Sequence, residues 1–319
     1  MQRILFVFLD GIGLGPAGPH NPFTKTEYTA LCHLAGEASW TAPLPVVDRP
    51  TRVVRPLDAT LGVEGLPQSG TGQAALFTGV NCASLVGRHF GPFPHSATHE
   101  VLAERNVFRR VAEAVRDDGT TAASPPGAAF ANAYPPQFFE QARRRGRWTV
   151  TTRSCLEAGV AVRDADALRR GCAVPADLTG WAWREKLGLD VPVVSAAESG
   201  RHLAEIARSH RLTLFEYFLT DKLGHGRLDA EPEDLLGQLD AFFGALIDDL
   251  DPDADTLVVT SDHGNLEDLS STVHTRNPVP LFVAGWAAPY FRSASSLLDV
   301  TPAIAAALRD AGPRSAPHP

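Results

Sequence analysis

Three apolar segments, far apart in the chain, each end in an aspartate. Asp10 follows the run 4–9, Asp221 follows the run 212–219 after one threonine, and Asp262 follows the run 256–260 after one serine. Imidazoles lie nearby at His225, His263 and His274. Carboxylate oxygens and imidazole nitrogens are the ligands that Mn²⁺ and Zn²⁺ take in proteins. Buried strands that end in such residues predict metal chemistry at one edge of a sheet.

The number of these side chains indicates more than one ion. Three carboxylates and three imidazoles exceed what a single tetrahedral ion with an open position requires. They suit two divalent ions about 4 Å apart, an arrangement that holds a phosphoryl group during in-line displacement. Two cations would also offset the mutual repulsion of the aspartates, which otherwise raises carboxyl pKa values. We therefore expect two ions, Mn²⁺ or Zn²⁺.

A serine is available as a nucleophile in the segment 65–79, which is predicted to be a loop that turns into a short helix. Ser69 would lie at or just before the helix N-terminus, where free N–H groups and the helix dipole favour an ionised hydroxyl. A serine alkoxide beside metal ions is a competent nucleophile near neutral pH. Thr71 competes for the role, and either hydroxyl is equally explained as a helix N-cap.

Each of these residues also has an ordinary structural interpretation. Alone, Asp10 would be read as a cap of the next helix, and Asp221 with His225 as a surface pair four residues apart. Asp262 and His263 are harder to explain without a ligand, because polar groups at a buried strand end carry a desolvation cost. Arg88 and His89 are candidate ligands of a substrate phosphate, or residues of a solvated loop. The run 143–145 of three arginines indicates a solvated helix face.

The elements that must position these residues alternate between strands and helices. Strands are expected at 4–9, 212–219, 256–260 and 280–283, and helices at 105–116, 198–209 and 233–250, with Thr301 as the N-cap of a last helix that ends near Gly312. Glycines 11, 13 and 15 follow the first strand, but they lack the third spacing of a dinucleotide fingerprint. The fold class is α/β, a doubly wound and mostly parallel sheet.

The middle of the chain lacks this alternation. We therefore predict a core formed by residues 1–119 and 196–312, with 120–195 as a small insertion or lid and 313–319 as a disordered tail. The net charge of −8 over 319 residues argues against nucleic acid as a partner. The four cysteines form no C-x-x-C pair and no segment approaches a membrane span, which predicts a cytoplasmic protein without a membrane partner. The oligomeric state stays open.

Five motifs, in this order along the chain, resemble the alkaline phosphatase superfamily. Within it they are most similar to cofactor-independent phosphoglycerate mutase and phosphopentomutase. The motifs are the segments 8–13, 65–72, 221–225, 260–265 and 274–280, and 296–302 resembles the closing strand–helix turn. The similarity covers roughly the first 90 and the last 120 residues, and the middle third is unmatched.

The resemblance implies a role for each matched residue. Asp10, Asp262 and His263 would hold one ion, and Asp221, His225 and His274 the other. Ser69 would bridge to the metals and be transiently phosphorylated. Two features depart from the mutases: Gln73 stands where they usually carry a histidine, and the chain is too short for their large substrate-clamping insertion.

The expected activity is phosphoryl transfer on a small phosphomonoester, a phosphorylated metabolite, through a phosphoserine. Water would resolve the intermediate in a phosphatase, and a hydroxyl of the retained organic group would resolve it in a mutase. Easier access of water without a clamp favours hydrolysis. Alternatives are a phosphodiesterase or other ester hydrolase on this scaffold, and a non-catalytic, metal-stabilised binding protein. A sulfatase is disfavoured, because Gly70-Thr71-Gly72 follows Ser69 instead of the sulfatase motif.

Overall fold

The computed structural model describes residues 1–25, 27–116 and 127–312, so the tail predicted at 313–319 lies outside the described residues. The strands are β1 (Arg3–Leu9), β2 (Val47–Arg49), β3 (Arg52–Leu57), β4 (Ala128–Phe130), β5 (Asn132–Ala133), β6 (Val174–Pro175), β7 (Leu212–Tyr217), β8 (Asp255–Thr260) and β9 (Val279–Gly285). The helices are α1 (Thr29–Leu34), α2 (Ser69–Thr78), α3 (Cys82–Val86), α4 (His99–Arg105), α5 (Val107–Arg116), α6 (Pro136–Arg145), α7 (Val150–Ala158), α8 (Ala165–Arg169), α9 (Trp181–Glu185), α10 (Ala196–Arg208), α11 (Leu219–Gly224), α12 (Pro232–Asp249) and α13 (Val300–Asp310).

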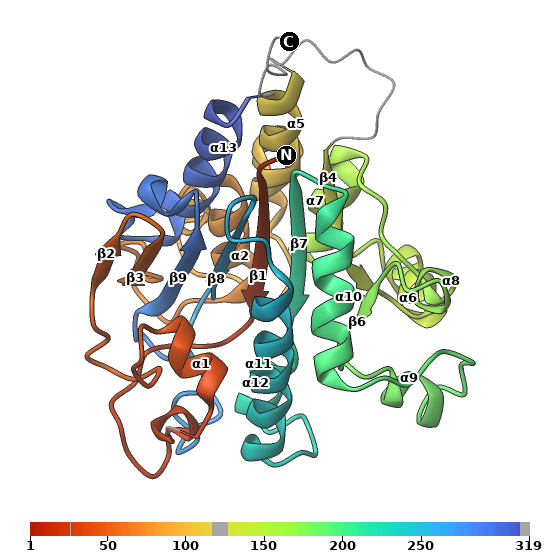
Figure 1. The fold of residues 1–319 in the computed structure, drawn as a ribbon, viewed down its shortest axis with the longest axis horizontal. Helices are drawn as coiled ribbons and strands as arrows, with labels where there is room; N and C mark the ends of the chain where they lie inside the picture. Colours follow the sequence, from red (N-terminus) through yellow and green to blue (C-terminus); the bar gives the residue numbers. More distant parts are fainter. Residues whose placement is uncertain (26, 117–126, 313–319) are drawn as a thin grey trace.

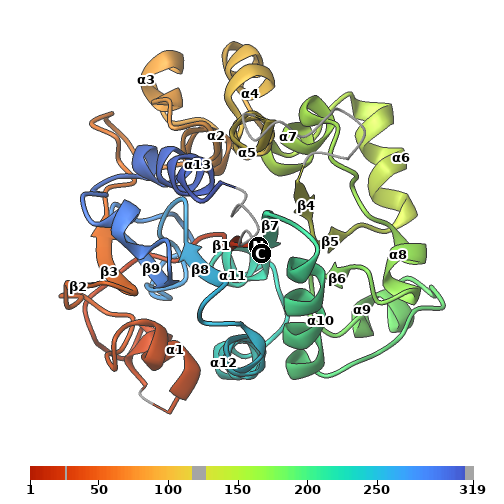
Figure 2. The same ribbon diagram turned by 45° about the horizontal axis from the view of Figure 1, so that its top comes forward.

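A seven-stranded sheet with the order β2-β3-β9-β8-β1-β7-β4 runs through the centre of the molecule. The four neighbouring strands β8, β1, β7 and β4 are parallel, and β9, β3 and β2 continue the sheet by antiparallel pairing. Helices cover both faces (Figures 1 and 2). The predicted α/β fold class is confirmed. The antiparallel arm, of which the sequence analysis foresaw only the strand at 280–283, extends the sheet on one side.

The alternation of side chains along β1 produces the two-layer core. Ile4, Phe6 and Phe8 point into a cluster formed with α2, α5 and α13, whereas the residues between them point into a second cluster formed with α1, α10 and α12. Successive side chains of a strand face opposite sides of the sheet, so an uninterrupted apolar run requires cover on both faces. Burial on both sides fixes the register of the strand and therefore the position of the residues that follow it.

Most of the predicted elements are confirmed within a few residues, as α5, α10, α12, β1, β7, β8 and β9. One detail of the last helix was wrong. Thr301 is not its N-cap: α13 begins at Val300 after Asp299. The Thr301 hydroxyl instead donates a hydrogen bond of 2.7 Å to the Leu76 carbonyl in α2. A Thr-Pro pair fits the first helical turn as well as the cap, and tertiary packing here selects the first turn.

The predicted insertion, residues 120–195, is only partly separate from the main sheet. Within its described part, β4 pairs in parallel with β7, and Val150 and Cys155 of α7 belong to the main core cluster. A smaller cluster that includes Leu168, Trp183 and Val191 lies beyond them. The division into a core and an insertion stays a prediction. Within the described residues, no helix is both long and apolar enough to cross a bilayer.

Candidate metal centre

The parallel strands deliver the three aspartates to one edge of the sheet. Leu9 pairs with Tyr217 and Phe8 with Thr260, so β1, β7 and β8 end at the same level. Asp10 follows the end of β1 directly, and Asp262 follows the end of β8 after one serine. Asp221 lies in the first turn of α11, which begins two residues after β7. Polar side chains beyond the carboxyl ends of parallel strands are the usual origin of α/β active sites.

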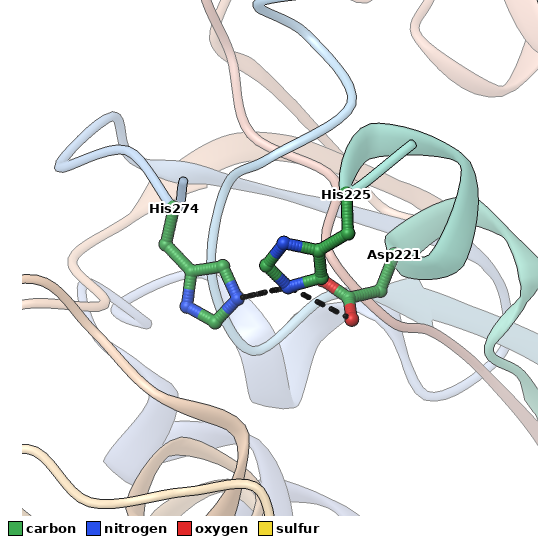
Figure 3. Close-up of side chains that lie close together, drawn as sticks. All are labelled: Asp221, His225 and His274. Carbon is green, nitrogen blue, oxygen red and sulfur yellow. Dashed lines mark hydrogen bonds and ion pairs between the residues drawn. The ribbon is translucent and has the colours of Figure 1, made fainter. Parts of the chain in front are cut away.

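Asp221, His225 and His274 form one compact group (Figure 3). The Nε2 atom of His225 lies 3.4 Å from Asp221 Oδ2, and the Nε2 atom of His274 lies 3.5 Å from Asp221 Oδ1. Figure 3 shows Asp221 reaching from α11, His225 from the residue that follows this helix, and His274 from a loop on the opposite side. One ligand atom from each of the three residues falls within 4.8 Å of the others. The set predicted for one ion is therefore brought together.

The two imidazoles of this group have their protons fixed by backbone carbonyls. His225 Nδ1 lies 2.7 Å from the Thr272 carbonyl oxygen, and His274 Nδ1 lies 2.7 Å from that of Pro67. Each Nδ1 must donate, which leaves a lone pair on each Nε2, and the two Nε2 atoms are only 3.0 Å apart. Two lone pairs at this distance repel unless a cation or an extra proton lies between them. The donor set thus fits a metal ion.

Asp10, Asp262 and His263 form the neighbouring group. His263 Nε2 lies 3.5 Å from Asp10 Oδ1 and 3.4 Å from Asp262 Oδ2. Those two oxygens are buried and, among the described residues, have no hydrogen-bond donor. Asp10, Asp221 and His263 also gather ligand atoms within 4.8 Å, so Asp221 lies between the two groups. Buried carboxylate oxygens without donors carry a large desolvation cost, which a divalent cation would offset.

The protonation of the cluster reflects this crowding. Burial, followed by the charges of Asp262 and Asp221, raises the pKa of Asp10 well above its ordinary value. Burial also lowers the pKa of His263, which keeps its imidazole in the neutral form that binds metals. Burial alone would raise the pKa of Asp221, but the neighbouring imidazoles of His274 and His263 and the amide of Asn265 hold it below the usual range. Strongly perturbed pKa values that are gathered at one place are characteristic of functional sites.

Ser69 lies beside this second group. It is the first residue of α2, and its Oγ is 3.0 Å from His263 Nε2. The N-cap position is Gln68, so the Ser69 hydroxyl does not serve as the cap. Thr71 is engaged elsewhere: its Oγ1 accepts a hydrogen bond of 3.1 Å from the Phe90 N–H. The contact with His263 favours Ser69 over Thr71 as the nucleophile.

Of the residues predicted to bind substrate, Arg88 and His89 show contacts away from the metal groups. The guanidinium of Arg88 lies 5.7 Å from the centre of the Phe90 ring. His89 Nε2 is 3.3 Å from the Val63 carbonyl oxygen, and burial lowers the pKa of this histidine. A role for Arg88, His89 or Thr71 toward substrate stays a prediction.

Four further polar residues contact the cluster or its loops or act on it by their charge. None of them was predicted from the sequence to do so. Gln73 Nε2 donates a hydrogen bond of 3.1 Å to Asp10 Oδ2, and Asn265 Nδ2 donates one of 2.8 Å to Asp221 Oδ1. Glu267 accepts from the N–H groups of Gly13 (2.9 Å) and Asn265 (2.7 Å), which ties together two loops of the site. Gln73 lies one helical turn after Ser69, a spacing that indicates a shared helix face.

The fourth residue is Glu216, a buried carboxyl in β7. It accepts a hydrogen bond of 3.2 Å from the Tyr134 hydroxyl, and burial raises its pKa to about 7. A charged residue inside the apolar run 212–219 is a sequence signal, because isolated carboxyls seldom occupy buried strands. Its charge contributes to the raised pKa of Asp10.

The comparisons with known proteins agree with this architecture. A sequence model of the family described as "Metalloenzyme superfamily" matches residues 190–309. The 2,3-bisphosphoglycerate-independent phosphoglycerate mutase of Legionella pneumophila (strain Paris) is 30% identical over 127 residues, 37% of this chain and 24% of that protein. The enzyme of the same name from Prochlorococcus marinus is 29% identical over 100 residues, 29% of this chain and 18% of that protein. These matches span less than a quarter of the curated relatives.

Solved structures resemble the chain along most of its length. The PH0037 protein from Pyrococcus horikoshii has a TM-score of 0.55 at 13% identity, over 99% of each chain. The cold-active alkaline phosphatase from the psychrophile Shewanella sp. has a TM-score of 0.51 at 12% identity, over 96% of this chain and 99% of that one. At these identities the likeness concerns the fold. The segment 190–309 that the family model matches contains five of the six aspartates and histidines predicted as ligands.

Proposed function

We propose that this protein is a two-metal phosphoryl-transfer enzyme that acts on a small phosphomonoester. Asp10, Asp262 and His263 would hold one divalent ion, and Asp221, His225 and His274 the other, with Ser69 adjacent. Bound Mn²⁺ or Zn²⁺ would neutralise charge on the phosphoryl oxygens and lower the pKa of a nearby hydroxyl. The observation that carries the proposal is the 3.0 Å contact of the Ser69 hydroxyl with His263 at the edge of this cluster.

The protein's own residues would prepare the nucleophile and the phosphate site. Ser69 opens α2, so its hydroxyl lies where backbone N–H groups have no partner within the helix. These N–H groups and the helix dipole favour negative charge on the hydroxyl and on a phosphate placed against it. Attack of Ser69 Oγ on phosphorus would form an O–P bond, release the alcohol of the ester and leave a phosphoserine.

Hydrolysis is the outcome that we propose for the phosphoserine. Gln73 donates to Asp10 and is therefore occupied within the cluster, in place of the histidine usual in the mutases that the sequence resembles. A water molecule would then release inorganic phosphate and restore Ser69. Intramolecular transfer in a phosphomutase would use the same first step and a hydroxyl of the retained organic group. A phosphodiesterase would need the same cluster and an open side for the second ester group.

The test is hydrolysis of 4-nitrophenyl phosphate by the purified protein, with Mn²⁺ or Zn²⁺ added and with a chelator in the control. The proposal predicts turnover that appears with metal and disappears with chelator. Bis(4-nitrophenyl) phosphate, assayed in parallel, separates a monoesterase from a phosphodiesterase. Two bound ions per chain without hydrolysis of either ester would favour a mutase or a non-catalytic binding protein.

A further inference from the structure

A second polar site lies outside the metal cluster. It is a pocket of about 410 Å³, formed by the loop 90–96, by His99 at the start of α4, and by the segment that joins α6 to α7. We call it the basic pocket and define it by His95, His99, Arg147 and Arg153, with Phe93 and Trp148 as its aromatic walls. None of the six is among the residues that we place in the metal cluster.

The charge of the basic pocket is opposite to that of the chain as a whole. Four of its side chains are basic, and none of the described residues that line it is Asp or Glu. The protein carries a net charge of −8 with its histidines counted as neutral, so two arginines in a lining without Asp or Glu form a local exception. The acidic partner of Arg153, Glu157, does not line the pocket. Clefts lined by one sign of charge concentrate ligands of the opposite sign. The pocket therefore selects anions.

Hydrogen-bond donors in the pocket are not fully used. Arg153 pairs through Nη1 with Glu157 at 3.3 Å, but its Nε is buried and has no acceptor among the described residues. His95 accepts the Ala97 N–H on Nδ1 at 3.2 Å, so in the neutral ring the proton is on Nε2, which is then a donor. The guanidinium and imidazole N–H groups of residues that line the pocket are suited to an oxyanion, because charge-assisted hydrogen bonds of this kind are strong.

The walls of the pocket suit the carbon skeleton of an organic anion. Phe93 and Trp148 are half-buried aromatic residues, and prolines 92 and 94 flank Phe93. The Arg147 guanidinium lies 5.9 Å from the centre of the Phe93 ring, which holds an exposed cation against an aromatic face. Small-molecule sites typically combine apolar walls with a few convergent polar groups.

The basic pocket is linked to the nucleophile through one loop. The Phe90 carbonyl accepts a hydrogen bond of 2.9 Å from the Thr71 N–H, in the first turn of α2. Gly70 has no room for a side chain, because a Cβ atom there would collide with the Phe93 carbonyl oxygen. The segment 90–93 thus contacts the two residues after Ser69 and also forms a wall of the pocket.

We propose that the basic pocket binds a phosphate or carboxylate group carried by a small organic molecule. Arg153 and His95 would donate to the oxyanion, and Phe93 and Trp148 would contact the carbon skeleton. The molecule is either the substrate itself, bound by a second anionic group, or a separate anion. The identification of the bound molecule as the substrate rests on the proposed function, whereas the binding of an organic anion in the pocket does not.

Binding is tested first on metal-free protein, with phenylphosphonate as the probe and calorimetry as the readout, in the presence of a chelator. We expect saturable binding that is at least tenfold weaker in Arg153→Gln. Arg144→Gln is the matched control, because Arg144 is exposed on α6 and does not line the pocket; it should change the affinity less than twofold. Absence of binding, or equal affinity in the wild type and Arg153→Gln, would overturn the proposal.

A second variant, Arg147→Gln, tests the proposal even if Arg153→Gln does not fold. Arg147 is exposed, and Arg147→Gln removes a charge from the pocket without touching the Arg153–Glu157 pair. It should weaken phenylphosphonate binding by about three- to tenfold while the far-UV circular dichroism is unchanged. An Arg147→Gln protein that is folded and binds the probe as tightly as the wild type would contradict the proposal even if Arg153→Gln is unfolded.

Whether the anion belongs to the substrate or to a separate molecule is tested on the metal-loaded enzyme. KM is measured for two substrates, phenyl phosphate and 4-carboxyphenyl phosphate. If the pocket holds part of the substrate, Arg147→Gln raises KM for the doubly anionic ester and leaves KM for phenyl phosphate unchanged. If it holds a separate anion, the variant affects both substrates equally. Because phenylphosphonate binding is measured without metal or turnover, failure of the proposed enzymatic function leaves that result intact.

Discussion

The metal cluster and the basic pocket are joined through the loop 90–94, yet they differ in charge and in construction. The cluster concentrates carboxylates at the ends of three strands. Four of its six aspartates and histidines are buried, and Gln73 and Asn265 donate hydrogen bonds to Asp10 and Asp221. The basic pocket brings arginines and histidines together from two loops and from α4 and α7, and its side chains are half-buried or exposed. A carboxylate cluster of this kind requires cations, whereas the pocket requires an anion. The difference indicates a rigid reacting centre beside a more adaptable recognition site.

The largest expected effect comes from the nucleophile. Ser69→Ala should lower turnover of 4-nitrophenyl phosphate by at least about 10³-fold, while the metal content measured by mass spectrometry stays near that of the wild type, since six other ligands remain. Ser84→Ala is the matched control, because Ser84 is an exposed serine of α3. Near-normal turnover in Ser69→Ala would show that the nucleophile is another residue.

Loss of a ligand should affect metal content as well as activity. Asp262→Asn removes a buried charge that would offset one ion, so the variant should bind about one ion fewer per chain and lose turnover. Asp253→Asn, on the exposed turn before the same strand, should retain both ions. If Asp262→Asn still binds two metal ions per chain, Asp262 is not a metal ligand. The contrast between a cation-binding cluster and an anion-binding pocket would then be weakened.

A smaller effect is expected at Gln73, which acts through Asp10. Gln73→Ala leaves Asp10 Oδ2 without its 3.1 Å donor, and loss of such a support typically weakens metal binding about 10- to 100-fold. The measurement is the metal concentration that gives half-maximal activity. Gln141→Ala on the surface of α6 should leave it unchanged. If Gln73→Ala instead changes KM at saturating metal, Gln73 contacts the substrate.

The subtlest prediction concerns the stability of the metal-free protein. The folded-state pKa of Glu216 is raised to about 7, from an unfolded value of 4.5. Between these pH values the folded state binds more protons than the unfolded state, so the contribution of Glu216 to stability falls as pH rises and levels off above about 7. We compare the free energies of unfolding of Glu216→Gln and the wild type in the presence of chelator. The difference, variant minus wild type, should increase by about 2–3 kcal/mol as the pH rises from 5 to 8. Urea unfolding across this range measures it, and a difference independent of pH would contradict the raised pKa.

The metal cluster could be predicted from the sequence because its residues follow strand ends. Apolar runs that must be buried fix the strands, and parallel pairing places the following aspartates at one edge. His225 could be predicted from its spacing of four residues after Asp221, and His274 from the motif at 274–280. The antiparallel strands β2 and β3 were missed. Val47–Arg49 is a three-residue strand at the edge of the sheet, and Arg52–Leu57 contains two arginines and a proline.

The supporting residues and the basic pocket could not be predicted in the same way. Asn265 and Glu267 contact segments more than 40 or 250 residues away, and no local pattern encodes such pairs. The pocket draws His95 and Arg153 from segments almost 60 residues apart, and the run of arginines nearby indicated only a solvated helix face. Functional residues that follow strand ends can be recognised from the local sequence, whereas a pocket between loops depends on tertiary packing.

The most direct test of the two-metal centre is anomalous diffraction from crystals grown with Mn²⁺, recorded at the manganese absorption edge. We expect two peaks, one among Asp10, Asp262 and His263 and the other among Asp221, His225 and His274. Ser69 Oγ should lie between them, and no peak should lie in the basic pocket. A single peak, or none at the ends of β1 and β8, would contradict a two-metal centre.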